Sequence, residues 1–121
     1  MKYLTLIFAI LTLTYWSQND TINQLDADGK KTGFWIVTGQ IRSNQGYCET
    51  CVIEEGVYKR SRKQGLWTKY YPNGQLKSII EYENGKAQGH FTTFREDGSL
   101  KEMGIWESYQ YKEHYQFSLQ G

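Results

Sequence analysis

The sequence predicts an all-β protein, an open antiparallel meander of stacked β-hairpin repeats that follows an N-terminal signal helix. The main observation is a motif that recurs at a constant spacing along the chain. Twelve glycines and a single proline suit a chain with many tight turns. No stretch after the first sixteen residues has the periodicity of a helix. At 121 residues, the chain has room for one small domain.

The first predicted element is the uncharged segment Tyr3–Trp16, which follows Lys2 and is rich in Leu, Ile and Phe. It is too short to cross the hydrocarbon layer of a membrane, which takes about 20 residues. It does suit the core of a secretory signal peptide. We therefore expect residues 1–18 to be a signal peptide, cleaved near residues 17–19, and the protein to be secreted or to reside in the periplasm or cell envelope. An uncleaved signal anchor and a buried N-terminal element are the alternatives.

Charge and composition narrow the class of partner. Removal of Lys2 with the signal peptide leaves 13 basic and 13 acidic residues, so the mature chain has no formal net charge. Binding to nucleic acid through its phosphates is therefore disfavoured, and we expect no nucleic-acid partner. Aromatic residues make up 16% of the chain, so rings must fill most of any core.

The repeat is the strongest signal in the chain. Residues 65–82 align with residues 89–106 at an offset of 24, which we call the repeat offset. Residues 28–35 give an earlier copy, in which Gly33 lies further before Gly65 than Gly65 lies before Gly89. A fixed period in this range indicates stacked copies of one supersecondary unit. We place units near residues 28–59, 60–83 and 84–107 and a capping strand at 108–121, all within a repeat domain that spans residues 19–121.

Each unit is predicted to consist of strand, turn, strand and turn. Asn-Gly and Asp-Gly pairs accept positive φ at both central residues of a tight hairpin turn. Arg60-Ser61 takes the place of such a pair, which predicts a longer or looser loop there. The predicted turn residues are Asn73, Gly74, Asn84, Gly85, Asp97 and Gly98. Strands are expected near residues 33–41, 52–59, 66–71, 75–82, 89–95, 99–106 and 109–119.

Glycines and aromatic residues recur together and predict how the units pack. A glycine leaves room for a neighbouring ring against the backbone, so we expect the aromatic residue two positions after each such glycine to join a ladder along the stack. Leucines follow the Asn-Gly and Asp-Gly turns on the inward face. The predicted packing set is Gly33, Trp35, Gly65, Trp67, Gly89, Phe91, Leu76 and Leu100.

The motif Gly65–Lys77, continued in Asn84–Gly89, resembles the MORN repeat variant family of bacterial proteins, often described as antitoxin-like members of toxin–antitoxin systems. The match runs from about Asp28 to Trp106. The resemblance implies an open, elongated antiparallel sheet and a role in protein association or close to a membrane. Residues 67–74 also resemble cell-wall-binding repeats, in which exposed rings form pockets for choline or sugars.

Cys48-Glu49-Thr50-Cys51 is the only compact reactive motif. In an exported protein the pair predicts a small structural disulfide; idle thiols, redox exchange and half of a metal site are the alternatives. A zinc site would need two further ligands, and His90 and His114 fit no known ligand spacing. We therefore expect no metal and no cofactor. No serine stands in a nucleophile context and no glycine-rich loop opens a helix, so we expect no enzymatic activity.

These features predict an exported, non-catalytic repeat protein that acts as an interaction or scaffold module at the cell envelope, with a protein as its partner. The alternatives are an antitoxin-like component and a glycan- or cell-wall-binding protein. The basic run Lys59–Lys63 would also suit an anionic membrane surface. Tyr and Trp supply large contact areas at low entropic cost. The predicted interaction surface consists of Tyr70, Tyr71, Phe94, Trp106, Lys59, Arg60, Arg62 and Lys63.

Overall fold

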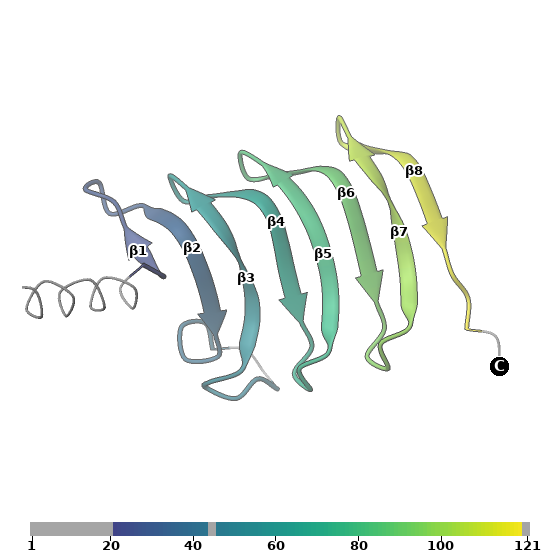
Figure 1. Cartoon of the computed structure of the whole chain (residues 1–121), viewed down its shortest axis with the longest axis horizontal. Helices are drawn as coiled ribbons and strands as arrows, with labels where there is room; N and C mark the ends of the chain where they lie inside the picture. Colours follow the sequence, from purple (N-terminus) through teal and green to yellow (C-terminus); the bar gives the residue numbers. More distant parts are fainter. Residues whose placement is uncertain (1–20, 44–45, 120–121) are drawn as a thin grey trace, which may run out of the picture.

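The computed structural model describes residues 21–43 and 46–119; the predicted signal peptide and its cleavage site lie outside these ranges. The described residues form one open sheet, in which each strand pairs antiparallel with the next strand along the chain (Figure 1). The predicted all-β antiparallel meander is therefore confirmed. The strands are β1 (Gln24–Leu25), β2 (Lys31–Thr38), β3 (Val52–Lys59), β4 (Arg62–Tyr70), β5 (Leu76–Glu83), β6 (Lys86–Phe94), β7 (Leu100–Glu107) and β8 (Gln110–Gln116).

The short strand β1 is the one described element that the sequence analysis does not predict. It is held by Asn23, whose side-chain amide makes the two hydrogen bonds with Ile36 that the backbone of an adjacent strand would make. Its Oδ1 accepts the Ile36 N–H at 2.8 Å, and its Nδ2 donates to the Ile36 carbonyl at 3.2 Å. The Trp35 indole N–H also donates to the Gln24 carbonyl at 3.1 Å. These contacts come from side chains, so the period of the strands does not reveal them.

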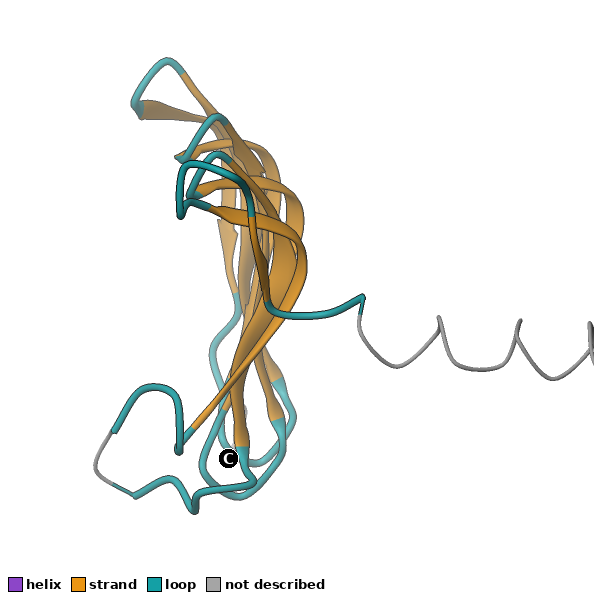
Figure 2. Ribbon diagram, turned by 90° about the vertical axis from the view of Figure 1, so that its left-hand side faces the viewer, coloured by secondary structure: helices purple, strands orange, loops and turns teal. Residues whose placement is uncertain are grey.

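The sheet is a single curved layer with its connecting loops at two ends (Figure 2). Contacts between strands run between neighbours in the sequence. Within the part of the chain that the structure describes, no helix has the length and hydrophobicity that a membrane span requires. The core must therefore form on a face of this one layer.

One end of the sheet carries a row of two-residue turns at residues 60–61, 84–85 and 108–109. Both central residues of each turn have positive φ, for example 52° at Arg60 and 60° at Ser61. Such turns match the twist of the flanking strands. The expectation of a looser loop at Arg60-Ser61 is wrong. The turn is instead fixed by the preceding unit, because the Ser61 hydroxyl accepts the Lys31 N–H at 2.8 Å and the Ser61 N–H donates to the Lys31 carbonyl at 2.9 Å.

The turns at the other end, between β4 and β5 and between β6 and β7, are longer. Gly74 and Gly98 have positive φ of 86° and 90°, whereas Asn73 and Asp97 are not among the described residues with positive φ. The Asn73 and Asp97 side chains instead each accept the backbone N–H two residues later at 2.9 Å. Positive φ at both central residues is thus confirmed for Asn84-Gly85 and wrong for the two longer loops.

The core lies on one side of the sheet, which we call the aromatic face. The Tyr58 ring lies between two tryptophans, with its centroid 5.9 Å from that of Trp35 and 4.7 Å from that of Trp67. Trp67 is the most deeply buried ring, at 1% exposure. Leu76 and Leu100 are half-buried at the starts of β5 and β7. The rings of the aromatic face are Trp35, Tyr58, Trp67, Tyr82, Phe91, Trp106 and Tyr111.

The repeated glycines Gly33, Gly65 and Gly89 all adopt a backbone conformation with positive φ. Their φ values are 73°, 75° and 101°. A Cβ at Gly33 or Gly65 would meet no atom within 4 Å, so the expectation that these two glycines make room for rings is wrong. Gly65 instead lies where the register between β3 and β4 slips, which is a β-bulge. The positive φ, which glycine adopts without steric cost, is what this position requires.

Room for a ring is made on the neighbouring strand. A Cβ at Gly56 of β3 would lie 2.5 Å from two atoms of the Trp67 indole, so the indole rests directly on the Gly56 backbone. Gly104 of β7 plays the same part for Phe91, whose Cε1 would be 2.9 Å from a Cβ there. The close approach of ring and backbone explains why Trp67 is buried although no second layer covers it.

Gly56→Ala should lower the free energy of unfolding by about 1–3 kcal/mol, the usual cost of overpacking a core. Gly65→Asn is the matched control, because its side chain enters open space and Asn tolerates positive φ; its effect should stay below about 1 kcal/mol. Urea unfolding followed by tryptophan fluorescence measures both. Wild-type stability of the Gly56→Ala protein would contradict the packing of Trp67 on this backbone.

Candidate functional site

Lysine side chains lie across the rings of the aromatic face. In the first unit, Lys31 Nζ is 5.1 Å from the centroid of the Trp35 ring and 5.0 Å from that of Tyr58. An ammonium over a ring face is attracted by the π-electrons, and the alkyl stem of the lysine covers apolar surface. The lysine therefore supplies part of the cover that a second layer would give.

Lys63 repeats this arrangement in the second unit and adds a carboxylate. Its Nζ is 4.6 Å from the centroid of Trp67 and 5.2 Å from that of Tyr82. The same ammonium donates to Glu54 Oε2 at 2.9 Å, and the Arg42 guanidinium donates to Glu54 Oε1 at 2.9 Å. Burial of the Glu54 carboxyl, which is 1% exposed, opposes its ionisation. The two cations outweigh this effect and hold the pKa of Glu54 below its ordinary value.

In the third unit the aromatic face opens into a hollow of about 270 Å³, which we call the aromatic hollow. Tyr111 of β8 stands beside it, 51% exposed. Its ring meets that of Trp106 edge to face at 4.6 Å between centroids and lies 5.5 Å from that of Phe91. The aromatic hollow is lined by Ile80, Ala87, Phe91, Thr93, Glu102, Trp106 and Tyr111.

The lining of the aromatic hollow includes one carboxylate, that of Glu102. Glu102 Oε2 lies 2.8 Å from His114 Nε2, and the His114 ring stacks on Tyr111 at 4.1 Å between centroids. The hydrogen bond with His114 holds the pKa of the Glu102 carboxyl below its ordinary value, so this group is ionised at neutral pH. The aromatic hollow therefore combines ring faces with a negative charge.

The predicted basic residues lie beside the turn between β3 and β4. Lys59, Arg60 and Arg62 are exposed and, with Lys30, border a surface hollow of about 500 Å³. Lys63 departs from this group, since its ammonium lies on the aromatic face. The structure thus divides the predicted basic run between two surfaces.

The predicted interaction residues Tyr70, Tyr71 and Phe94 lie at the end of the sheet with the longer loops, and all three are half-buried. The Tyr70 hydroxyl donates to Glu55 Oε1 at 2.6 Å, and this bond together with burial raises the pKa of Tyr70 to about 12. The Tyr71 hydroxyl donates to the Phe94 carbonyl at 2.6 Å. These bonds join one strand pair to the next, so the hydroxyls are engaged in holding the sheet. Trp106 alone among the four predicted aromatic residues lines the aromatic hollow.

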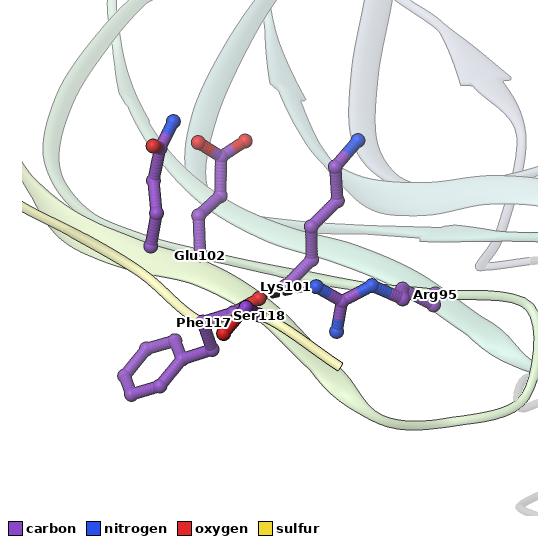
Figure 3. Close-up of a pocket in the computed structure, with 6 residues that line it drawn as sticks. Arg95, Lys101, Glu102, Phe117 and Ser118 are labelled. Atoms are coloured by element: carbon purple, nitrogen blue, oxygen red, sulfur yellow. Dashed lines mark hydrogen bonds between the residues drawn. The ribbon is translucent and has the colours of Figure 1, made fainter. Parts of the chain in front are cut away.

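A further hollow, of about 460 Å³, lies where the chain leaves β8 (Figure 3). Figure 3 shows the Arg95 guanidinium beside the segment that contains Phe117 and Ser118. Arg95 donates to the Phe117 carbonyl and, at 2.8 Å, to the Leu100 carbonyl. These bonds fasten the C-terminal segment to β7. We therefore assign this hollow a structural role.

Cys48 and Cys51 form a disulfide in the connection between β2 and β3. The Gly39 N–H donates to the Cys51 carbonyl at 3.0 Å. A Cβ at Gly39 would lie 2.2 Å from the Cys48 carbonyl oxygen, so the bridged turn packs closely against the chain just after β2. Among residues 21–43 and 46–119, no three His, Cys, Asp or Glu side chains come together as a metal site would require.

Sequence reasoning missed three residues of β3 that point to the aromatic face, namely Glu54, Gly56 and Tyr58. Each precedes its equivalent in β5 by one repeat offset. The alignment starts at Gly65, and the extra residues of the first unit hide the same period on the strand before it. Ala87 was also missed, because an alanine does not by itself indicate a binding site. Its position becomes informative only when it is compared with the equivalent residues of the other units.

Comparison with protein families matches residues 63–84 to the MORN repeat variant. These residues contain nearly all of β4 and β5 and the loop between them, which is one hairpin of the sheet. The resemblance to the MORN repeat variant is therefore confirmed. Comparison with curated proteins and with solved structures finds no match.

Glu54→Gln should destabilise the protein and weaken the dependence of its stability on pH in acid. The folded-state pKa of Glu54 lies below its unfolded value of 4.5, so its contribution is present above that pH and is lost as pH falls through the folded value. At pH 7 we expect a cost of about 1–3 kcal/mol, because the variant leaves two partly exposed cations without their carboxylate. Urea unfolding between pH 7 and pH 3 measures both effects.

Glu96→Gln is the control for this prediction, since Glu96 is exposed on the loop between β6 and β7. It should keep the wild-type dependence of stability on pH. An equal loss of stability in acid for the Glu54→Gln protein and the wild type would show that the buried carboxylate does not contribute.

Proposed function

We propose that this chain, which contains a MORN repeat variant, is a non-catalytic protein-interaction module and binds its partner on the aromatic face near its C-terminal end. The observation that carries the proposal is the aromatic hollow, where Trp106 is half-buried and Tyr111 is 51% exposed, while Phe91 at its base is buried. Partly exposed Trp and Tyr side chains around a concave apolar surface are typical of interaction sites.

The two carboxylates of this face, Glu54 and Glu102, are each held by neighbouring side chains, which suits a binding surface with fixed charges. Glu54 is paired with Arg42 and Lys63, and Glu102 with His114. These contacts hold the two carboxylates in fixed positions. A binding site needs rings, shape and a few fixed charges, and the aromatic hollow offers all three.

A glycan is the second candidate ligand, because the rings of Trp106 and Tyr111 that line the aromatic hollow could also stack on a sugar. A binding assay with purified cell wall separates this candidate from a protein partner. An antitoxin role rests on the family resemblance alone.

We also propose that the protein is exported to the cell envelope. Two observations support export: the uncharged segment 3–16 and the disulfide between Cys48 and Cys51, a bond that persists in oxidising compartments. The basic residues beside the turn between β3 and β4 then face the same compartment as the partner.

Export predicts a shortened chain without free thiols. Intact-mass spectrometry of protein recovered from the envelope fraction should find a mature chain that begins near residues 17–19 and takes up no iodoacetamide before reduction. Recovery of the full-length chain from the cytoplasm, with both cysteines alkylated, would contradict export.

Tyr111→Ser should weaken partner binding about tenfold or more, since a central aromatic contact of an interface commonly contributes that much. Tyr115→Ser is the matched control. Tyr115 lies on the same strand with 56% exposure against 51% for Tyr111. The register shift between the Trp106–Tyr111 and Ile105–Glu113 pairs places Tyr115, which pairs with Met103, on the opposite face. Capture from envelope extract, quantified by mass spectrometry, measures the difference. Equal binding by the two variants would contradict the proposed surface.

A further inference from the structure

All three units have equivalent aromatic residues, but only the first two have a lysine that covers them. Lys63 follows Lys31 at the same spacing at which Gly65 follows Gly33. Both lysines place their ammonium groups 4.6–5.2 Å from two ring centroids. The next equivalent position, one repeat offset after Lys63, is Ala87. The third unit therefore lacks its own lysine at the place where the first two have one.

The rings on which this missing lysine would lie are still present. Trp67 and Tyr82 of the second unit correspond, at the repeat offset, to Phe91 and Trp106 of the third. Both line the aromatic hollow, and Ala87 lines it as well. The adjacent lysine, Lys86, does not replace the missing one, because its ammonium lies 5.3 Å from the ring centroid of Tyr109 in the next turn.

A carboxylate also lines the aromatic hollow, although it comes from another strand. Glu54, which pairs with Lys63, corresponds to Ser78 in the next unit, and Ser78 cannot supply a negative charge. Glu102 corresponds to Glu54 two units on and lines the aromatic hollow. The aromatic hollow thus offers ring surface of Trp106 and Tyr111 together with a negative charge, the two kinds of contact that hold the ammonium of Lys63.

We propose that the aromatic hollow binds the side chain of a lysine from the protein partner, whose ammonium takes the place that Lys31 and Lys63 occupy in the first two units. This inference rests on the proposed function and specifies its ligand. A cation that lies over ring faces and beside a carboxylate is held favourably, whether it belongs to the same chain or to a partner. Here the chain supplies the carboxylate and the rings, with Tyr111 beside Phe91 and Trp106, and the partner supplies the cation.

The test uses n-butylammonium, which has the alkyl stem and head group of lysine, and N-butylacetamide as its neutral counterpart. Binding is followed by the NMR shift of the Trp106 indole N–H in the mature protein. We expect saturable binding of n-butylammonium and at least tenfold weaker binding of N-butylacetamide. Ala87→Lys should fill the aromatic hollow from within and weaken n-butylammonium binding at least tenfold. Equal binding of the two probes, or unchanged binding by Ala87→Lys, would overturn the inference.

Glu102→Gln tests the charge, with Glu113→Gln as its matched control. Glu113 pairs with Ile105 and therefore points to the opposite face. Removal of the Glu102 charge should weaken n-butylammonium binding several-fold, and removal of the Glu113 charge should leave it unchanged. Equal effects of the two variants would argue against the inference. So would preference for tetramethylammonium over n-butylammonium, which would assign the hollow to a quaternary ammonium ligand.

The partner captured from envelope extract separates this inference from the proposed function. Ala87→Lys, and acetylation of the partner's lysines, should each weaken capture at least tenfold. If Tyr111→Ser weakens capture while these two changes do not, the interaction surface stands and the lysine ligand is wrong. If n-butylammonium binds but Tyr111→Ser and Ala87→Lys both leave capture unchanged, both the surface and the ligand are wrong.

Discussion

The described sheet is one layer thick, and this constraint determines much of the remaining structure. A β-sheet usually buries a face against a second layer of strands or helices. Here the rings of the aromatic face are covered by neighbours within the same layer. Trp67 reaches 1% exposure because it rests on Gly56, is flanked by Tyr58 and lies beneath the ammonium of Lys63. The buried carboxylate of Glu54 is part of the same solution, since it holds the ammonium of Lys63 in place.

The strand order could be predicted from the sequence because the period and the turn residues are local signals. The conformation of Arg60-Ser61 could not, because a contact with Lys31, in the preceding unit, holds this turn. Glycine gives a related ambiguity. Gly65 provides a positive φ and Gly56 provides space, yet the residue type is the same at both positions. The sequence indicates that a glycine is required at each position, and the structure shows whether it is required for a positive φ or for space beside a ring.

The candidate site was only partly predictable for a similar reason. Trp106 could be chosen from its place in the repeat, and it does line the aromatic hollow. Tyr70 and Tyr71 looked equally suitable as exposed aromatic residues, but their hydroxyl groups bond to Glu55 and to the Phe94 carbonyl. Residue type predicts what a side chain can do. Which acceptor in the neighbouring hairpin a hydroxyl reaches depends on how the strands are placed in the folded sheet.

Contacts in this sheet link each strand to its neighbours along the chain. Adjacent strands are about 4.8 Å apart, so each pair of strands lengthens the molecule by about 10 Å. A duplication or deletion of one whole unit would therefore alter the span of the protein in fixed steps while the hairpins on either side keep their surroundings. In this architecture the number of repeat units determines the length of the protein.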